Sequence, residues 1–221
     1  MELDLHCHTR RSFDCSMDPA KVVRVARSRG LDGIAVTDHD EIEGAFEARR
    51  AAGGDLLVIV GEEIDTKGGD IIGLFLREIV REEDPLRAIE AIHAQGGIAV
   101  LAHPFAKTLT LEDRVARALD ACEGFNARHA KMRSVDNGLG EPEAVTFANS
   151  YDLSLVAGSD AHFYREIGRA RTILPAASLD EAKEAILRGE TALTGRRSGP
   201  FNLLAAAALR SLKRLIHPEP D

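Results

Sequence analysis

Tryptophan is absent from this 221-residue chain, and the aromatic residues together make up only 5% of it. A surface that stacks the bases of single-stranded nucleic acid depends on aromatic side chains, so such a platform is not expected. Positive charge is also in short supply, since the formal net charge is −8. An extended basic groove for duplex DNA is therefore not expected either.

Cysteine is scarce as well, with Cys7, Cys15 and Cys122 as its three occurrences. Their spacing fits no zinc finger, and three are too few for a disulfide framework. No apolar run approaches the roughly 20 residues of a membrane span. No signal peptide precedes the charged, strand-like residues 1–6. These absences predict a cytoplasmic protein in a reducing compartment.

Apolar runs alternate with helical patterns along most of the chain, which is typical of an α/β fold with parallel strands. Two helices are expected to begin at Asp18-Pro19 and Asp84-Pro85, because aspartate caps a helix and proline suits its first position. The other expected helices are 112–119, 141–149 and 179–188. The expected strands are 3–6, 33–37, 57–62, 71–76, 98–102, 122–126, 153–157 and 170–174.

Histidine is concentrated in short motifs that carry or adjoin carboxylates at the ends of these strands. The motifs are His6-Cys7-His8, Thr37-Asp38-His39, His103-Pro104 and Gly158-Ser159-Asp160-Ala161-His162. Imidazole and carboxylate together are the ligands of zinc, manganese and iron sites. One strand can present both histidines of the first motif to the same side, because strand side chains alternate. The pattern predicts a metal-dependent hydrolase.

The positions of the motifs favour a closed barrel over an open sheet. Each motif falls at the carboxyl end of an expected strand or in the loop after it. Side chains from many such ends converge on one face of a barrel. An open sheet instead places ligands at a switch point between two strands. No GxGxxG motif or P-loop indicates nucleotide binding of the usual kinds.

The character of the chain changes after Gly199-Pro200. Residues 1–197 are expected to form the barrel domain. Residues 198–221 are expected to form an amphipathic helix and a tail that pack on the barrel or on a partner subunit. Docking of this helix on a membrane surface is a weaker alternative.

The ordered motifs resemble the PHP (polymerase and histidinol phosphatase) family over roughly residues 1–197. The resemblance implies a distorted (β/α)₇ TIM-like barrel with parallel strands, and a site for three divalent zinc, manganese or iron ions at their carboxyl ends. It also implies a phosphoester substrate. The residues that carry it are Asp4-Leu5-His6-Cys7-His8-Thr9, Ser12-Phe13-Asp14, Thr37-Asp38-His39, Gly61-Glu62-Glu63-Ile64, Ala102-His103-Pro104 and Gly158-Ser159-Asp160-Ala161-His162.

The same resemblance implies nine metal ligands in three groups. The first metal is assigned to His6, His8 and Asp160, the second to His103 and His129 with Glu63 bridging the two, and the third to Asp14, His39 and His162. Glu62 could compete for the bridging role, but the Gly-x-Glu pattern of the family places the ligand at Glu63. The expected catalytic residues are Glu63, Asp14 and His162.

Charge supports a phosphoester substrate independently of the resemblance. Three carboxylates with three divalent cations would leave the site at about +3, which attracts an anion. Water bound to such a metal has its pKa lowered to roughly 7, so a metal-bridging hydroxide can attack phosphorus at neutral pH. Arginine and lysine suit further contacts with phosphate. The candidates for these contacts are Arg128, Arg10 and Lys131.

The predicted function is hydrolysis of a small phosphomonoester, a nucleotide or a short oligonucleotide. One alternative is the hydrolysis of a carbon–nitrogen bond by an amidohydrolase-type site. Another is a non-catalytic binding module that metals stabilise. The sequence leaves open the metal, the substrate, the general acid and the oligomeric state.

Overall fold

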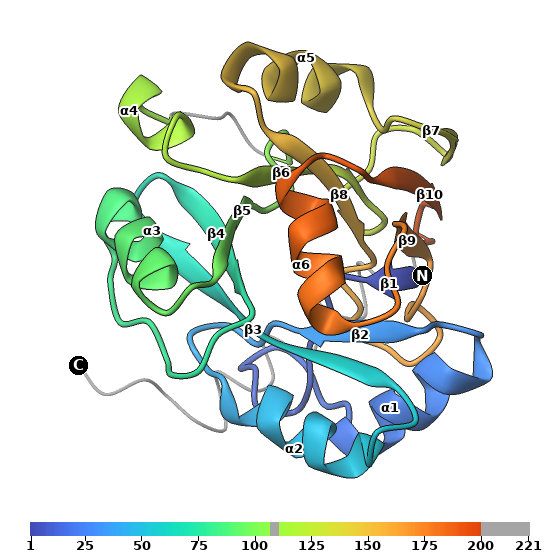
Figure 1. The fold of residues 1–221 in the computed structure, drawn as a ribbon. Helices are drawn as coiled ribbons and strands as arrows, with labels where there is room; N and C mark the ends of the chain where they lie inside the picture. Colours follow the sequence, from blue (N-terminus) through green and yellow to red (C-terminus); the bar gives the residue numbers. More distant parts are fainter. Residues whose placement is uncertain (107–110, 200–221) are drawn as a thin grey trace.

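The computed structural model describes residues 1–106 and 111–199, which form one curled ten-stranded sheet with helices outside it (Figure 1). The strand order is β7-β10-β9-β1-β2-β3-β4-β5-β6-β8. The strands are β1 (Glu2–Asp4), β2 (Gly33–Val36), β3 (Leu57–Thr66), β4 (Gly69–Leu74), β5 (Ile98–Leu101), β6 (Ala121–Asn126), β7 (Ser134–Gly138), β8 (Ser154–Gly158), β9 (Ala170–Ile173) and β10 (Ala192–Arg196).

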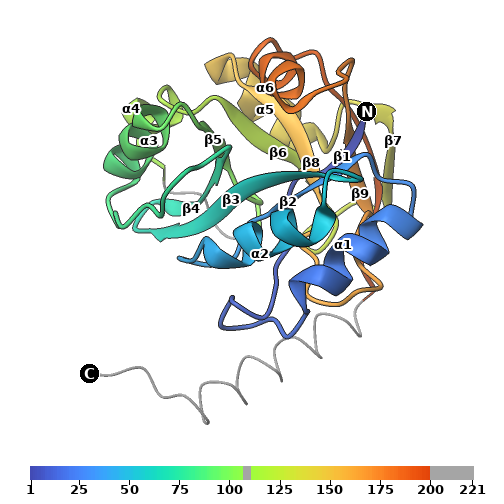
Figure 2. The ribbon, with the colours of Figure 1, turned by 60° about the horizontal axis from the view of Figure 1, so that its bottom comes forward.

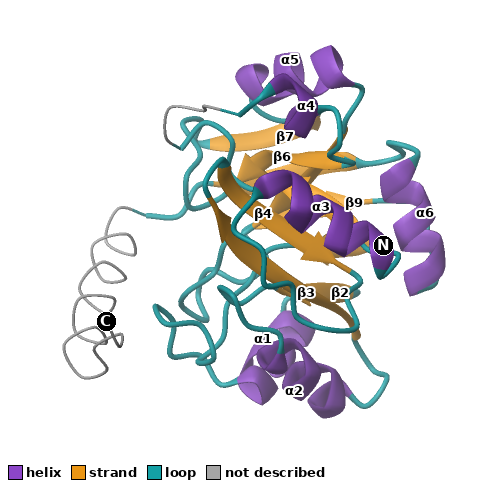
Figure 3. Cartoon of the chain, turned by 90° about the vertical axis from the view of Figure 1, so that its left-hand side faces the viewer, coloured by secondary structure: helices purple, strands orange, loops and turns teal. Residues whose placement is uncertain are grey.

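The helices cover the outside of this sheet, with α1 and α2 side by side and α3 and α5 on other parts of the surface (Figures 2 and 3). The Asp-Pro starts are confirmed, since Asp18 accepts from Lys21 N and Asp84 accepts from Leu86 N and Arg87 N. The helices are α1 (Pro19–Ser28), α2 (Glu43–Ala52), α3 (Pro85–Ala94), α4 (Asp113–Ala116), α5 (Pro142–Tyr151) and α6 (Leu179–Leu187).

The α/β class and the curled, barrel-like sheet are confirmed, and hydrogen bonds join the ends of β1 and β8. Leu5 N donates to Ala157 O at 3.4 Å, and Asp160 N donates to His6 O at 2.8 Å. The carboxyl end of β1 therefore lies beside the loop that follows β8. This closure brings the first and last histidine motifs together.

The expectation of parallel strands holds for only part of the sheet. β1, β2 and β3 are parallel neighbours, and so are β5, β6 and β8. β4 is antiparallel to both β3 and β5, and β9 is antiparallel to β1. Only Lys67 and Gly68 separate β3 from β4. A parallel connection needs a crossover of about a dozen residues, so this short turn enforces a hairpin.

Three elements were not predicted from the sequence: β7, β10 and α2. α2 lacks a start signal, because Ile42 at its N-cap provides no capping side chain. It also contains Gly44, which weakens a helical pattern. A β-carbon at position 44 would lie 1.9 Å from Asp38 Oδ2. Packing against that carboxylate therefore explains the glycine.

Apolar side chains of the strands and of α6 form the core beneath the site. Leu3, Ile59 and Ile72 are buried in one cluster with Ala182 and Ile186 of α6. α6 follows the end of β9 that pairs with the start of β1. It therefore closes the end of the barrel opposite the histidine motifs.

None of the helices in the described part of the chain is long and apolar enough to cross a membrane. The predicted C-terminal helix and tail lie outside the described residues from position 200 onward. Their existence and their packing stay predictions, as does the boundary at residue 197.

Candidate metal centre

The nine ligands predicted from the sequence form one continuous cluster of side chains. They come from β3 and from the segments that follow β1, β2, β5, β6 and β8, and each lies within 4 Å of another member. They are His6, His8, Asp14, His39, Glu63, His103, His129, Asp160 and His162. The structure thus brings together residues that lie up to 156 positions apart (162 − 6).

His6 and His8 point their Nε2 atoms at the same place. These two atoms are 3.1 Å apart, and Oε2 of Glu63 lies 3.1 Å from the first and 3.2 Å from the second. Oδ1 of Asp160 lies 3.4 Å from His8 Nε2. Two imidazole nitrogens and two carboxylate oxygens around one point form a donor set that suits zinc, manganese or iron.

His103 and His129 form a second group on the other side of Glu63 and Asp160. His103 Nε2 lies 2.9 Å from Oε1 of Glu63, so the two oxygens of this carboxylate face different groups. His129 Nε2 lies 3.4 Å from Oδ2 of Asp160. The sequence assigned Asp160 to the first metal alone, whereas its position allows it to be shared by two.

Asp14, His39 and His162 form a third group. Oδ2 of Asp14 lies 2.8 Å from His162 Nε2 and 3.7 Å from His39 Nε2. Ser12 Oγ donates to the other oxygen of Asp14 at 2.7 Å, which fixes the orientation of the carboxylate. His8 lies close enough to this group to contribute to it.

The charge state of the cluster in the absence of metal follows from burial and from its own carboxylates. Burial lowers the pKa of His8, but Asp160 and Glu63 outweigh it and raise this pKa to about 10. Burial likewise opposes a charged His103, yet Glu63 raises its pKa to about 9. Burial raises the pKa of Glu63, but His6 and His39 hold it well below the usual range. The carboxylates are thus ionised, and bound cations would replace protons on the imidazoles.

Two members of the cluster have left-handed backbone conformations, His103 with φ of 27° and Asp160 with φ of 52°. Such conformations cost about 1–3 kcal/mol in residues other than glycine and are frequent at functional sites. Both residues lie just after a strand, where the chain turns its side chain into the cluster.

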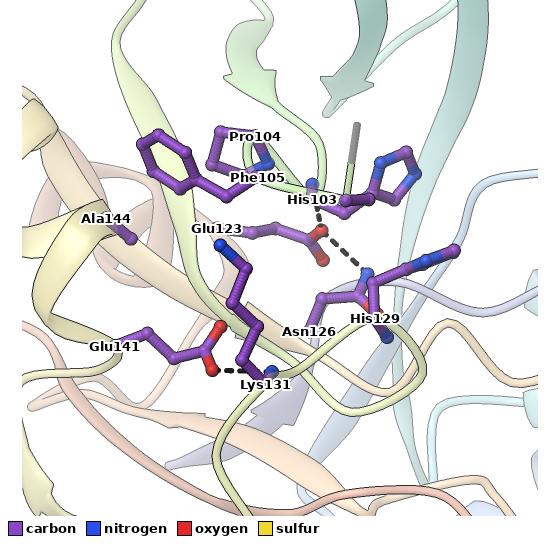
Figure 4. A pocket seen from close by; sticks show the side chains of 10 residues that line it. His103, Pro104, Phe105, Glu123, Asn126, His129, Lys131, Glu141 and Ala144 are labelled. Carbon is purple, nitrogen blue, oxygen red and sulfur yellow. Dashed lines mark hydrogen bonds between the residues drawn. The ribbon is translucent and has the colours of Figure 1, made fainter. Parts of the chain in front are cut away.

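Glu123 is a functional candidate that the sequence analysis missed. Its side chain is buried on β6 and accepts from His103 N at 2.7 Å and from Asn126 Nδ2 at 2.8 Å (Figure 4). Its Oε1 also lies 3.0 Å from His6 Nδ1. A proton on Nδ1 leaves the Nε2 lone pair of His6 free for a metal. The feature of the sequence that could have indicated this role is a single carboxylate within the apolar strand 121–126.

Asp70 is a second missed candidate. Its Oδ2 lies 3.6 Å from His103 Nε2, and it forms a possible metal-binding group with Glu63 and His103. Asp70 stands on β4, which returns toward the site because it is antiparallel to β3. Since the sequence predicted a parallel strand beginning at 71, nothing in it indicated this placement.

Glu62 and Glu63 are neighbours on β3 and point to opposite faces of the sheet. Only Glu63 reaches the cluster, while Glu62 accepts from Val80 N at 2.8 Å. Glu62 is buried on the face that does not carry the histidines, and this burial raises its pKa to about 7. The geometry therefore leaves Glu63 as the candidate for the bridging role.

The cluster opens into a cavity of about 210 Å³. Of the predicted phosphate contacts, Arg128 lines this cavity. Lys131 lines a smaller adjoining pocket with His103 and His129 (Figure 4). Its Nζ lies 2.5 Å from Glu143 Oε2. Arg10 lines neither and pairs with Asp18 and Glu47 on the surface.

Comparisons with known proteins identify several relatives of the chain. A family model described as PHP-associated matches residues 142–191. The uncharacterised protein MJ1587 of Methanocaldococcus jannaschii is 37% identical over 143 residues, which cover 58% of this chain and 84% of that protein. MJ0417 of the same organism is 33% identical over 180 residues, covering 77% and 69%. A 5'-3' exoribonuclease of Haemophilus influenzae is 40% identical over 76 residues, only 27% of its length and 32% of this chain.

Solved structures share the fold at lower identity. PsfC of Pseudomonas syringae has a TM-score of 0.65 at 21% identity, covering 96% of this chain and 98% of its own. An amidohydrolase of Chromobacterium violaceum, solved with bound sulfate and no metal, has a TM-score of 0.60 at 17% identity, covering 90% and 99%. A "putative metal-dependent phosphoesterase" of Bifidobacterium adolescentis has a TM-score of 0.57 at 20% identity, covering 73% and 88%. These likenesses concern the fold alone.

Proposed function

This chain belongs to the PHP (polymerase and histidinol phosphatase) family, and from that premise we propose that it is a metal-dependent phosphoesterase acting on a small phosphomonoester or a nucleotide-like phosphoester. The observation that carries the proposal is the convergence of nine imidazole and carboxylate side chains in one cluster, six of which line a single cavity. The cavity volume of about 210 Å³ suits a small phosphorylated group or one end of a longer chain.

The residues of the cluster fit divalent cations. The facing Nε2 atoms of His6 and His8 lie 3.1 Å apart, and Glu63 Oε2 lies 3.1 and 3.2 Å from them, so these donor atoms surround one point that a cation could occupy. Zinc, manganese or iron ions held by these groups would supply water activated near neutral pH and positive charge for the phosphoryl oxygens.

The side chains of the protein have separate proposed roles. Glu63 directs one oxygen to each of two groups and so sets the spacing between the cations they would hold. Asp14 keeps its pKa well below the usual range: burial opposes this, but hydrogen bonds from His162 and His39 prevail. It therefore serves as a ligand that orients His162 and not as the proton donor.

Arg128 is the proposed contact for the substrate phosphate. It is 6% exposed and lines the cavity beside His129 and Asp160. A guanidinium presents paired donors that match phosphate oxygens. Substitution of Arg128 by alanine is expected to raise the KM for phosphoesters and to leave the metal content unchanged. Loss of metal together with activity would contradict this role.

One set of activity assays distinguishes the proposed phosphoesterase from the two alternatives, an amidohydrolase and a non-catalytic binding module. Purified chain supplied with manganese or zinc is tested on 4-nitrophenyl phosphate, bis(4-nitrophenyl) phosphate, nucleotides, short oligonucleotides and an amide panel. Phosphoester turnover that disappears in His103→Ala supports the proposal. Turnover of amides alone would replace it with an amidohydrolase function. Metal-replete protein without turnover on any of these would indicate a binding module.

A further inference from the structure

Glu166, in the loop after β8, has a carboxylate that is fully buried. The residue is 0% exposed, and its Oε1 atom has no hydrogen-bond partner among the described residues. A carboxylate that is removed from water destabilises a fold unless hydrogen bonds and an opposite charge compensate it. The contacts of the other oxygen, Oε2, therefore show what holds this side chain in place.

The Oε2 atom of Glu166 closes the turn that carries a predicted metal ligand. It accepts from the backbone N–H groups of His162 and Phe163, each at 3.1 Å. The backbone closes the same turn, since Glu166 N donates to Phe163 O at 2.8 Å. His162 Nε2 in turn lies 2.8 Å from Asp14 Oδ2, in the third group of the cluster. Glu166 therefore fixes the backbone from which His162 reaches the metal centre.

The same oxygen of Glu166 faces Arg128, which belongs to a different loop, the one after β6. Arg128 Nη1 lies 3.6 Å from Glu166 Oε2, a distance that indicates an ion pair rather than a hydrogen bond. This is the one ion pair that Arg128 makes within the described part of the chain. A single carboxylate oxygen thus contacts both the turn after β8 and the charge of the arginine after β6.

The ion pair with Glu166 leaves N–H donors of Arg128 for another partner. A guanidinium carries five N–H groups in a planar fork, and this contact involves Nη1 alone. The backbone of Arg128 is held separately, because its N–H donates to Asn126 Oδ1 at 3.0 Å. The side chain is buried and lines the metal-site cavity. Glu166 therefore determines where in the cavity wall the guanidinium lies.

We infer that Glu166 is a positioning residue, which holds the Arg128 guanidinium in the wall of the metal-site cavity and ties it to the turn that carries His162. Contacts with a substrate require the protein groups to be placed within about 0.5 Å of the productive geometry, which supporting charges and hydrogen bonds ensure. The inference rests on the proposed function, in which Arg128 contacts the substrate phosphate. Glu166 itself contacts neither substrate nor metal, and its effect on binding passes through Arg128.

Glu166→Gln separates this role from closure of the turn. Glutamine keeps an oxygen acceptor for the two backbone N–H groups and removes the charge that holds Arg128. On the metal-loaded full chain, KM for 4-nitrophenyl phosphate should rise about tenfold while kcat and metal content stay nearly unchanged, since the lost contact concerns binding. In an Arg128→Ala background the same substitution should change KM by less than about twofold, because residues in one ion pair are not additive.

Glu190→Gln is the matched control. Glu190 forms an exposed ion pair with Arg188 at 2.9 Å, so this variant removes the same charge from an arginine partner on the surface. Its KM and phosphate affinity should equal those of the wild type.

Calorimetric titration of the metal-loaded chain with inorganic phosphate separates this inference from the proposed function. If no phosphoester is hydrolysed, but Glu166→Gln weakens phosphate binding about tenfold and has no further effect in Arg128→Ala, the positioning role stands and the phosphoesterase fails. If phosphoesters are hydrolysed, but Glu166→Gln equals the wild type in KM and phosphate affinity, the positioning role is refuted. Loss of metal in Glu166→Gln, or the same effect with and without Arg128, also refutes it, because Glu166 would then act through the turn of His162.

Glu166→Asp keeps the test decisive if circular dichroism shows that the glutamine variant does not fold. Aspartate retains the charge on a side chain that is one methylene shorter, so it should draw the guanidinium of Arg128 away from the cavity. Phosphate binding should then weaken by a factor of up to about ten. Wild-type phosphate affinity in the folded aspartate variant would refute the inference.

Discussion

Glu63 Oε1 lies 2.9 Å from His103 Nε2, across the hairpin strand β4 that separates β3 from β5. This contact joins the two halves of the barrel at the cluster. The other oxygen of Glu63 faces His6 and His8 in the segment after β1, so a single carboxylate contacts side chains from three parts of the barrel. The consequences of removing its charge are therefore larger than for any single histidine.

Replacement of Glu63 by glutamine should release at least one equivalent of bound metal per chain. Substitutions that only support metal ligands reduce affinity by about 10–100-fold, so loss of a shared ligand should reduce kcat/KM for phosphoesters at least ~100-fold. Metal analysis of the purified variant and steady-state kinetics measure both effects. Glu62→Gln is the matched control, because its side chain lies on the other face of β3 and should leave the metal content intact.

Replacement of Glu123 by glutamine should weaken metal binding without emptying the site. Glutamine keeps an acceptor for His103 N but loses the charge that holds the proton on Nδ1 of His6. A reduction in affinity of about 10–100-fold is expected. Competition with a chromogenic chelator measures it. Unchanged affinity would show that Glu123 only supports the backbone at His103.

Asp70→Asn tests whether β4 contributes to the centre. Its carboxylate lies 3.6 Å from His103 Nε2, so its loss should lower the affinity of the second group by roughly tenfold. Asp65→Asn is the control on the adjacent strand, since Asp65 also lines the cavity but belongs to none of the metal-binding groups found among the described residues. Equal affinities in the two variants would exclude Asp70 as a ligand.

Much of the fold could be predicted from local signals. The Asp-Pro pairs at 18–19 and 84–85 determine two helix starts because capping and the fixed φ of proline act within a few residues. Eight strands were predicted within four residues of their ends, since apolar runs reflect burial. The direction of β4 could not be derived from its composition, because it depends on the length of the turn before it.

The residues of the candidate site also fall into two groups, those that a local motif predicts and those that no local signal indicates. Motifs such as His6-Cys7-His8 combine several metal-binding residue types within one short segment and are visible in the sequence. Glu123 and Asp70 are single carboxylates whose histidine partners lie at least 20 positions away in the chain. The proximity of such residues arises only when the strands assemble. Neither has a neighbour in the sequence that could indicate its role.

Gly158 tests the tightness of packing beneath the cluster. A β-carbon at this position would lie 2.3 Å from His6 Cβ and 2.8 Å from Glu123 Oε1. Gly158→Ala should therefore displace His6 and destabilise the fold by about 1–3 kcal/mol, the usual range for overpacking. Denaturant unfolding and metal analysis should show both losses. Gly199→Ala, where no atom lies within 4 Å of the added carbon, is the matched control.

Glu62 gives a pH dependence of stability that is separate from catalysis. Burial raises its pKa from 4.5 to about 7, and Asp40 adds to the shift while a hydrogen bond from Val80 N opposes it. Between these two pH values the folded chain keeps a proton that the unfolded chain has released. Stability therefore falls as the pH rises from 4.5 to 7 and stays lower above that range.

Glu62→Gln removes this titration while keeping the shape of the side chain and an acceptor for Val80 N. At pH 8 the variant should exceed the wild type in unfolding free energy by an amount on the order of 3 kcal/mol, and at pH 4 the two should be nearly equal. Urea unfolding at several pH values measures the difference. A constant difference across this range would mean that the pKa of Glu62 is the same in the folded and the unfolded chain, and would contradict the rise caused by burial.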